Sequence, residues 1–290
     1  MLILKWWSLG HFLSIFLPMV FIAIAYLILR KRTPKTQKIV ILTLMLINVA
    51  QHLFKSWVWY PLYKGVFDLR NITFCNVCAT SILVSPIIFV LKNKGLKDAL
   101  FYHGLLGGIM SLWFVSVEYG VSIISLEFIR YFSCHAILMM TSILPVLLGL
   151  HTLSVKRFWV VGVCFIAAET IVFLDNFLIL AFQNKMDWSY AYNKVYQENQ
   201  LLIMHAPTPA VFEHTFLRDT RVKYLIDDGT CFYIPVLWSL PALLPAVSGF
   251  ALLVTWLCTK IKLDGRYLAE KWKKEEVQEE PEEEQKIENQ

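Results

Sequence analysis

The stretch HFLSIFLPMVFIAIAYLIL, from His11 to Leu29, carries no charged side chain and is long enough to cross a lipid bilayer as a helix. It is too long for the apolar segment of a signal peptide, and it ends in Arg30-Lys31-Arg32 without a small-residue cleavage site. We therefore expect this segment to remain in the protein as a membrane anchor, with its helix spanning residues 8–29.

Six more apolar blocks follow the first one along the chain. We expect helices at residues 39–60, 72–91, 99–117, 127–150, 158–182 and 232–259. The 290-residue chain is 57% hydrophobic and only 17% charged, and its mean hydropathy is +0.55. An ordinary soluble domain carries about 25% charge, so composition excludes a soluble enzyme, a nucleic-acid-binding domain and a disordered chain. The sequence predicts an all-α, polytopic membrane protein that folds as a seven-helix bundle.

The basic residues predict how the bundle is oriented. Of the 27 Lys and Arg residues, 17 lie in the segments 30–38, 92–97, 156–157 and 260–286, which all fall on one side of the predicted membrane. Short cytoplasmic segments are enriched in Lys and Arg. We expect the N-terminus outside, the C-terminus in the cytoplasm and the protein in the cell membrane, which is the plasma membrane if the source is bacterial.

Two segments lie outside the predicted helices. The transmembrane domain would cover residues 1–262 and include an external loop at residues 183–231. Residues 263–290 form a charged tail that ends in EEVQEEPEEEQKIENQ, and this low-complexity acidic sequence cannot bury a hydrophobic core. We expect the tail to be disordered in the cytoplasm.

Polar residues inside membrane helices are candidates for function because an unpaired polar group in hydrocarbon costs free energy. On the predicted spans, four helices place such residues at one depth, in the outer half of the bundle. These residues are Gln51, His52, Cys75, Asn76, His135, Asp175 and Asn176. Their shared depth predicts a polar cavity that opens toward the outer leaflet or the outside.

Cys75 and His135 offer the chemistry of a nucleophilic pair. A histidine can take the proton of a nearby thiol, and an amide such as that of Asn176 can orient the imidazole. The thiolate would require a lowered pKa, which the start of a helix and the histidine would supply. The alternative is structural, because Cys packs as a small apolar residue and a single His often bonds across helices.

The other small and sulfur-containing residues suggest packing. Cys75 and Cys78 are spaced like half of a metal site, but no second pair completes it, so we expect neither a metal nor a cofactor. A disulfide between Cys75 and Cys231 is possible because both lie at outer helix ends. Gly104 and Gly108 are spaced to let two helices approach closely.

Four short motifs carry a family resemblance. They are Cys75-Asn76-Val77, Lys92-Asn93-Lys94, the stretch YHGLLG at residues 102–107, and YFSCH at residues 131–135. Together they resemble the YwaF-like integral membrane family, whose eukaryotic relative is transmembrane protein 164. The resemblance covers roughly residues 70–150. It implies a seven-helix membrane protein and an acyltransferase that moves fatty acyl chains between phospholipids, with Cys75 as nucleophile and His135 as base.

Three functions remain open on the sequence. The first is a lipid acyltransferase or acyl hydrolase that uses Cys75 and His135. In it, Gln51, His52, Asn76 and Asn176 would bind the substrate. The second is a small-solute transporter or channel, and the third is a non-catalytic membrane protein. We expect membrane lipids as partners and no nucleic acid, while the sequence names no protein partner.

Overall fold

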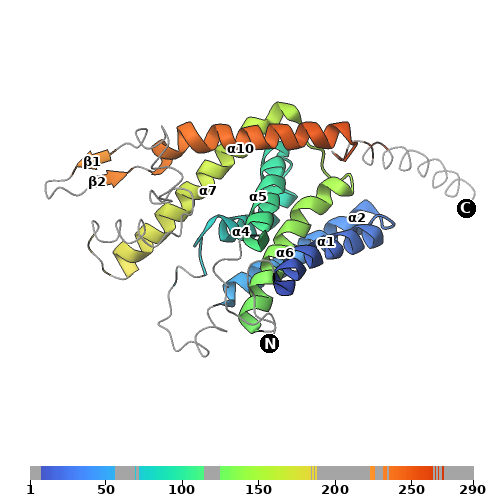
Figure 1. The fold of residues 1–290 in the computed structure, drawn as a ribbon, viewed down its shortest axis with the longest axis horizontal. Coiled ribbons are helices and arrows are strands. Elements are labelled where there is room, and N and C mark those ends of the chain that lie inside the picture. The colour runs from blue at the N-terminus through green and yellow to red at the C-terminus, as the bar shows by residue number, and fades with distance from the viewer. Residues whose placement is uncertain are drawn as a thin grey trace, which may run out of the picture.

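The computed structural model describes residues 8–55, 72–113, 125–183 and 235–263, together with a few shorter pieces of the 290-residue chain. These residues form seven long helices (Figure 1). Their bounds are α1 Leu9–Leu29, α2 Pro34–Leu53, α4 Val77–Val90, α5 Lys94–Trp113, α6 Leu126–Leu147, α7 Phe158–Leu178 and α10 Pro235–Lys260. The all-α architecture with seven helices confirms the fold class predicted from the apolar blocks.

Capping residues set several helix starts, and these starts differ from the hydropathy boundaries. Thr33 and Asn76 precede α2 and α4, and each side chain accepts a hydrogen bond from a backbone N–H of the first turn. Asn93 accepts from the backbone N–H groups of Gly95 and Leu96 at the start of α5. Hydropathy carries no information about helix caps. The predicted helix starts at residues 39, 72 and 99 were therefore each wrong by five residues, since α2, α4 and α5 begin at residues 34, 77 and 94.

α2 and α7 also differ from the prediction at their ends. α2 ends at Leu53, and residues 56–60 of the predicted span lie outside the described residues. α7 is preceded by a 3₁₀ turn, Val155–Arg157, and continues as a π-helix, Ile179–Gln183. Together these pieces make the longest apolar helical segment in the described part of the chain.

The helices pack as two overlapping groups (Figure 1). α6 contacts α1, α2 and α5, while α7 contacts α10, α5 and α4. One buried apolar cluster joins α5, α6, α7 and α10 through residues such as Tyr102, Val161 and Ala251. A second joins α1, α2, α5 and α6 through residues such as Ile41, Met45 and Leu144. α5 and α6 belong to both clusters and therefore link the two groups.

The distribution of side chains is that of a membrane protein. Large apolar side chains such as Phe16, Trp159 and Trp256 point outward, while polar residues such as Asn48, Asp98 and Glu169 are buried. A soluble bundle would expose its polar groups to water. Four helical segments are long and apolar enough to cross a membrane, and Val77–Val90 and Leu244–Lys260 are shorter apolar helices. The protein is therefore a membrane protein in which polar contacts join the helices.

Glycines allow α5 to approach α6 closely. A side chain at Gly104 would collide with Ser142, and one at Gly108 would come within 2.7 Å of Met139. Both contacts lie on one face of α5, as the spacing of four residues predicts. The expected role of these two glycines in close helix packing is confirmed.

A short hairpin precedes α10. β1, Lys223–Leu225, pairs antiparallel with β2, Cys231–Tyr233, with Lys223 opposite Tyr233. The last helix therefore begins at Pro235 rather than at residue 232. Most of the predicted external loop 183–231 and most of the tail at 263–290 lie outside the described residues.

Candidate functional site

Cys75 lies immediately before the capped start of α4. The side chain of Asn76 accepts a hydrogen bond of 2.8 Å from the backbone N–H of Ala79, so Asn76 is the N-cap and Cys75 precedes it. The sequence placed both residues in the first turn of the helix, and the cap shows that they lie outside it. Cys75 is a free thiol with only 8% of its surface exposed, so the possible disulfide to Cys231 is not formed.

The segment that carries Cys75 is held by two helices. Oδ2 of Asp175, on α7, accepts a 2.6 Å hydrogen bond from the Thr73 hydroxyl and a 3.1 Å bond from the Phe74 N–H. Asn176 donates to the Phe74 carbonyl at 3.5 Å. From α2, Nε2 of His52 lies 2.9 Å from the Thr73 carbonyl, and it must donate because a carbonyl oxygen only accepts. We call Asp175, Asn176 and His52 the clamp.

Lys55 is the charged group that contacts Cys75. Its Nζ lies 4.0 Å from Sγ, and Arg130 also interacts electrostatically with the thiol. Burial raises the pKa of Cys75, and the positive charge of Lys55 opposes this shift without cancelling it. The sequence argument required a lowered pKa at Cys75. The expected lowering is wrong, because burial favours the neutral thiol over the thiolate.

His135 lies on α6 at the same end of the bundle. Its Nδ1 is 2.8 Å from the carbonyl of Tyr131, and the two rings are in contact with centroids 4.3 Å apart. Since the carbonyl is an acceptor, Nδ1 carries the proton, and Nε2 of the neutral ring has a lone pair. His135 thus has the tautomer of a general base, with Nε2 as the basic nitrogen.

Gln51 connects α2 to the part of α6 that carries His135. Its Oε1 accepts from the Ser133 hydroxyl at 2.9 Å and from the Cys134 thiol at 3.3 Å. Asn48 donates to the Cys134 carbonyl at 3.0 Å, one turn along α2. These bonds fix the rotation of α6 relative to α2 and hence the direction in which His135 leaves its helix.

The candidate residues predicted from the sequence therefore lie at one end of the bundle, which we call the Cys75 end. Cys75 and His135 both interact electrostatically with Lys55 and Arg130. Among the described contacts, no hydrogen bond joins Cys75 to His135, and their pairing stays a prediction. The four residues expected to bind substrate make hydrogen bonds inside the protein: His52 and Asn176 hold the Cys75 segment, Asn76 caps α4, and Gln51 bonds α6.

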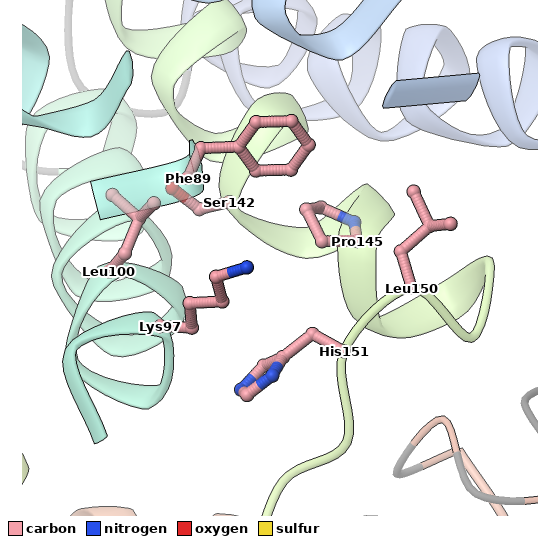
Figure 2. A pocket seen from close by; sticks show the side chains of 7 residues that line it. All are labelled: Phe89, Lys97, Leu100, Ser142, Pro145, Leu150 and His151. Carbon is pink, nitrogen blue, oxygen red and sulfur yellow. The ribbon is translucent and has the colours of Figure 1, made fainter. Parts of the chain in front are cut away.

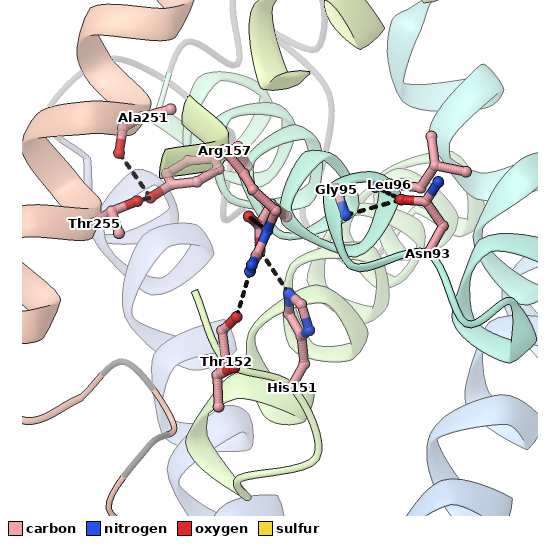
Figure 3. A network of polar contacts seen from close by, with 10 residues as sticks. Asn93, Gly95, Leu96, His151, Thr152, Arg157, Ala251 and Thr255 are labelled. Atoms are coloured by element: carbon pink, nitrogen blue, oxygen red, sulfur yellow. Dashed lines mark hydrogen bonds and ion pairs between the residues drawn. The ribbon is translucent and has the colours of Figure 1, made fainter. Parts of the chain in front are cut away.

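A second polar cluster includes His151, Thr152 and Arg157 (Figure 3), and it lies at the opposite end of the bundle, where α5 begins and α6 ends. Asp98, on α5, is 2% exposed. It accepts from Nε of Arg157 at 2.6 Å and lies 2.6 Å from Nε2 of His151. Arg157 also donates to the Thr152 carbonyl at 2.7 Å. This network joins the start of α5 to the connection between α6 and α7.

A small cavity opens beside this network, with room for about one water molecule (Figure 2). His151 and Lys97 line it together with the apolar side chains of Phe89 and Leu100. The ammonium of Lys97 lies 5.8 Å from the centre of the Phe89 ring, in the geometry of a cation–π contact. The cavity is too small for a lipid, and it lies at the far end of the bundle from Cys75.

Sequence reasoning missed three features of these sites. The sequence analysis did not single out Lys55 and gave Asp175 only as one member of a polar set, because the fold alone brings them to Cys75 and its segment. Asp98 carried a usable signal, since an acidic residue in an apolar block requires a polar partner.

Among the described residues, no group of three or more His, Cys, Asp and Glu side chains is arranged to bind a metal ion.

Comparison with known proteins identifies the family. No curated protein and no solved structure matches the chain. A profile of the TMEM164 family matches residues 6–227, which include the clamp, Cys75, Lys55 and His135. This match covers more than half of the chain and contains the four motifs that carried the resemblance. The chain is therefore a membrane protein of the TMEM164 family.

Proposed function

We propose that the protein is a membrane-embedded acyl-transfer enzyme. Cys75 takes an acyl group from a lipid ester and passes it to a lysolipid or to water, and His135 moves the protons. The observation that carries the proposal is the setting of Cys75: a free thiol on a segment clamped from two helices, with Lys55 at 4.0 Å. A thiol that only filled space would need neither the clamp nor the cation.

The first half of the reaction forms a thioester. Nε2 of His135 takes the thiol proton, and the sulfur attacks the ester carbonyl carbon of the lipid. The tetrahedral intermediate collapses by breaking the bond to the alcohol oxygen, which receives the proton from the imidazolium as the lysolipid leaves. The acyl group stays on Cys75, and His135 is neutral again.

The second half regenerates the thiol. The hydroxyl of a lysolipid, or water, attacks the thioester carbonyl while His135 takes its proton. The carbon–sulfur bond breaks, and the thiolate recovers the proton from His135. Lys55 stabilises the thiolate in both halves because its positive charge lies close to the sulfur. An alcohol as acceptor gives transfer, and water gives hydrolysis.

The proposed site faces the outer leaflet, with the N-terminus outside and the C-terminus in the cytoplasm. The supporting observation is the asymmetry of basic residues, which are enriched at the ends of the helices opposite to Cys75. The surrounding helices expose apolar side chains, among them Phe12, Leu53 and Phe54, to the membrane. An acyl chain of a membrane lipid therefore meets a surface of matching polarity.

The test is acyl exchange by the purified full-length protein in nanodiscs. The substrates are a phospholipid with an isotope-labelled acyl chain and an unlabelled lysophospholipid, and mass spectrometry follows the label. We expect the wild type to transfer or release the label, and Cys75→Ala to lose the activity. His135→Ala should lose at least about 100-fold, which is the usual contribution of a general base.

Cys164→Ala is the matched control, because Cys164 is a half-buried free thiol on α7 with no described hydrogen bond. It should retain full activity. Rapid quenching of the wild type should also trap an acyl thioester on Cys75 that hydroxylamine removes. Full exchange by a folded Cys75→Ala protein would refute the proposal and favour a transporter or a non-catalytic role.

A further inference from the structure

Glu169 is a buried carboxyl group that the acyl-transfer site does not use. It lies near the middle of α7 and is 1% exposed. Its Oε2 has no hydrogen-bond partner, and no ion pair with Glu169 is found in the described part of the chain. A carboxylate without a counter-charge is strongly disfavoured in hydrocarbon, so the group is stable there as the neutral acid.

Glu169 lies near the seam between α4 and α5, the two helices that pack against this side of the bundle along with α7. Cys78, on α4, interacts electrostatically with both Glu169 and Cys75, so it lies near both groups. Its sulfur is 3.7 Å from the Ser111 hydroxyl on α5. Gly107 makes room for this contact, because a side chain there would come within 3.2 Å of the Cys78 sulfur. Glu169 thus faces a polar seam instead of lipid.

Two other buried polar groups lie along α7. Asn176 is seven residues beyond Glu169, about 10 Å along the helix, and its Oδ1 also has no described partner. In the other direction, the ring of His103 packs edge-on against Phe165, one turn before Glu169, and its Nε2 has no described partner. Glu169, Asn176 and His103 therefore form a series of buried polar groups beside α7, each with an atom that has no described partner.

The remaining titratable groups on the helices that pack against α7 have other surroundings. On α5, Asp98 pairs with Arg157, and the Tyr102 hydroxyl bonds Ala251 and Thr255. On α10, the described titratable groups are Cys258 and Lys260, at its C-terminal end. Lys94 and Lys97, also on α5, lie toward its N-terminal end. Cys78 is therefore the titratable group with a described interaction with Glu169, and it carries no permanent positive charge.

We propose that Glu169 is a reversible proton-binding site in the interior of the bundle, linked through Cys78 and Ser111 to the end that holds Cys75. Its ligand is a proton, which the buried carboxyl group holds because a carboxylate without a counter-charge is disfavoured there. The carboxyl oxygen without a partner accepts the proton, and Cys78 and Ser111 are the polar groups that lead from it toward the Cys75 end. This site is independent of whether Cys75 transfers acyl groups.

An apolar carbodiimide tests the site directly, because it enters membranes and reacts with protonated carboxyl groups. We expect dicyclohexylcarbodiimide to modify Glu169 of the full-length protein in nanodiscs, with less labelling as pH rises. Asp98 is the matched control, since it is equally buried but paired with Arg157 and His151. It should stay unlabelled. A water-soluble carbodiimide should label the exposed Glu270 and not Glu169.

Infrared spectroscopy provides a second measurement on the same protein. The carbonyl band of a protonated carboxylic acid should be present in the wild type and missing in Glu169→Gln. Its shift on transfer to deuterated buffer should be slower in Cys78→Val, which fills the seam with an apolar side chain of similar size. Absence of the band from folded wild-type protein, labelling that is equal at Glu169 and Asp98, or labelling that does not change with pH would overturn the proposal. Unchanged exchange in Cys78→Val would overturn the link to the Cys75 end.

Discussion

At the scale of single residues, the balance between burial and charge decides the reactivity of Cys75. Burial stabilises the neutral thiol, whereas Lys55 and Arg130 stabilise the thiolate. The net effect raises the pKa, so the thiolate forms only when a base or alkaline solution removes the proton. A cysteine in this setting reacts when a substrate and a base are both in position.

Removing the charge of Lys55 should therefore slow the alkylation of Cys75. Lys55→Met keeps much of the length of the side chain but loses its charge, which raises the pKa of Cys75 further. Loss of one pKa unit of stabilisation would reduce the rate about tenfold at a given pH below the pKa. The measurement is the pH dependence of iodoacetamide labelling, mapped by mass spectrometry. Cys164 in the same protein is the internal control, and a labelling curve for Cys75 that does not move would contradict this role of Lys55.

Loss of Asp175 should release the Cys75 segment. Asp175→Ala leaves the Thr73 hydroxyl and the Phe74 N–H without their shared acceptor. We expect Cys75 to become more accessible to a water-soluble maleimide while acyl exchange falls at least about tenfold, since small misplacements at a reacting centre are costly. Leu174→Ala, on the exposed side of α7, is the control and should change neither value. Unchanged labelling in Asp175→Ala would show that the clamp does not hold the segment.

At the scale of helices, the close packing of α5 against α6 depends on two glycines of α5, Gly104 and Gly108, which have no side chain. Gly104 lies against Ser142 and Gly108 against Met139, and either position would meet a neighbour if it carried a Cβ. Helices in a membrane gain no hydrophobic stabilisation from association, so close van der Waals contact and polar contacts decide their packing. The α5–α6 contact consequently tolerates little increase in side-chain volume.

Gly104→Val should lower the stability of the folded protein by about 1–3 kcal/mol, the usual cost of overpacking. Gly249→Ala is the control, because nothing lies within 4 Å of a Cβ at that position, and its effect should stay within about 0.5 kcal/mol. The midpoint of thermal unfolding in the same detergent compares the two variants. A Gly104→Val protein as stable as the control would mean that α5 and α6 separate without cost.

The network around Asp98 should hold the opposite end of the bundle together. Arg157→Met removes the two-point contact to a buried carboxylate and should destabilise the protein by about 3 kcal/mol, as is typical when one partner of a buried pair is lost. Lys94→Met, at an exposed position in the first turn of α5, is the control. Equal melting temperatures for the two variants would show that the network contributes no stability.

At the scale of the whole molecule, the two ends of the bundle have different chemistry. The Cys75 end combines a thiol, a histidine and the clamp, whereas the opposite end carries the Asp98 network and, in the described part of the chain, basic residues such as Lys31, Lys92 and Lys260. An odd number of membrane crossings places the two termini on opposite sides. The charge asymmetry then predicts which side each end faces.

Tags at the two termini test this orientation. We expect a protease added to intact cells to remove an N-terminal tag and to leave a C-terminal tag protected, and both tags should be cleaved after permeabilisation. The C-terminal tag in intact cells serves as the control for cell integrity. Accessibility of both tags in intact cells would require an even number of crossings, and accessibility of the C-terminal tag alone would reverse the orientation.

Much of the architecture follows from the sequence alone, because membrane helices are specified locally. About 20 apolar residues suffice to span the bilayer, and a helix satisfies its own backbone hydrogen bonds, so each span is readable without its neighbours. The seven helices and the membrane character were predictable for this reason. Helix ends were predicted less well, since they depend on caps such as Thr33, Asn76 and Asn93.

Tertiary structure alone decided which polar residues meet. Asp175 holds Thr73 and Phe74 across about a hundred residues of chain, and Asp98 and Arg157 come from different parts of the bundle. Depth along a helix can be read from the sequence, whereas the direction of a side chain around the helix axis depends on how the neighbouring helices pack. The shared depth of the polar residues could therefore be predicted from the sequence. The contact of Lys55 with Cys75 and the lack of a described partner at Oε2 of Glu169 depend on how the helices pack around these residues.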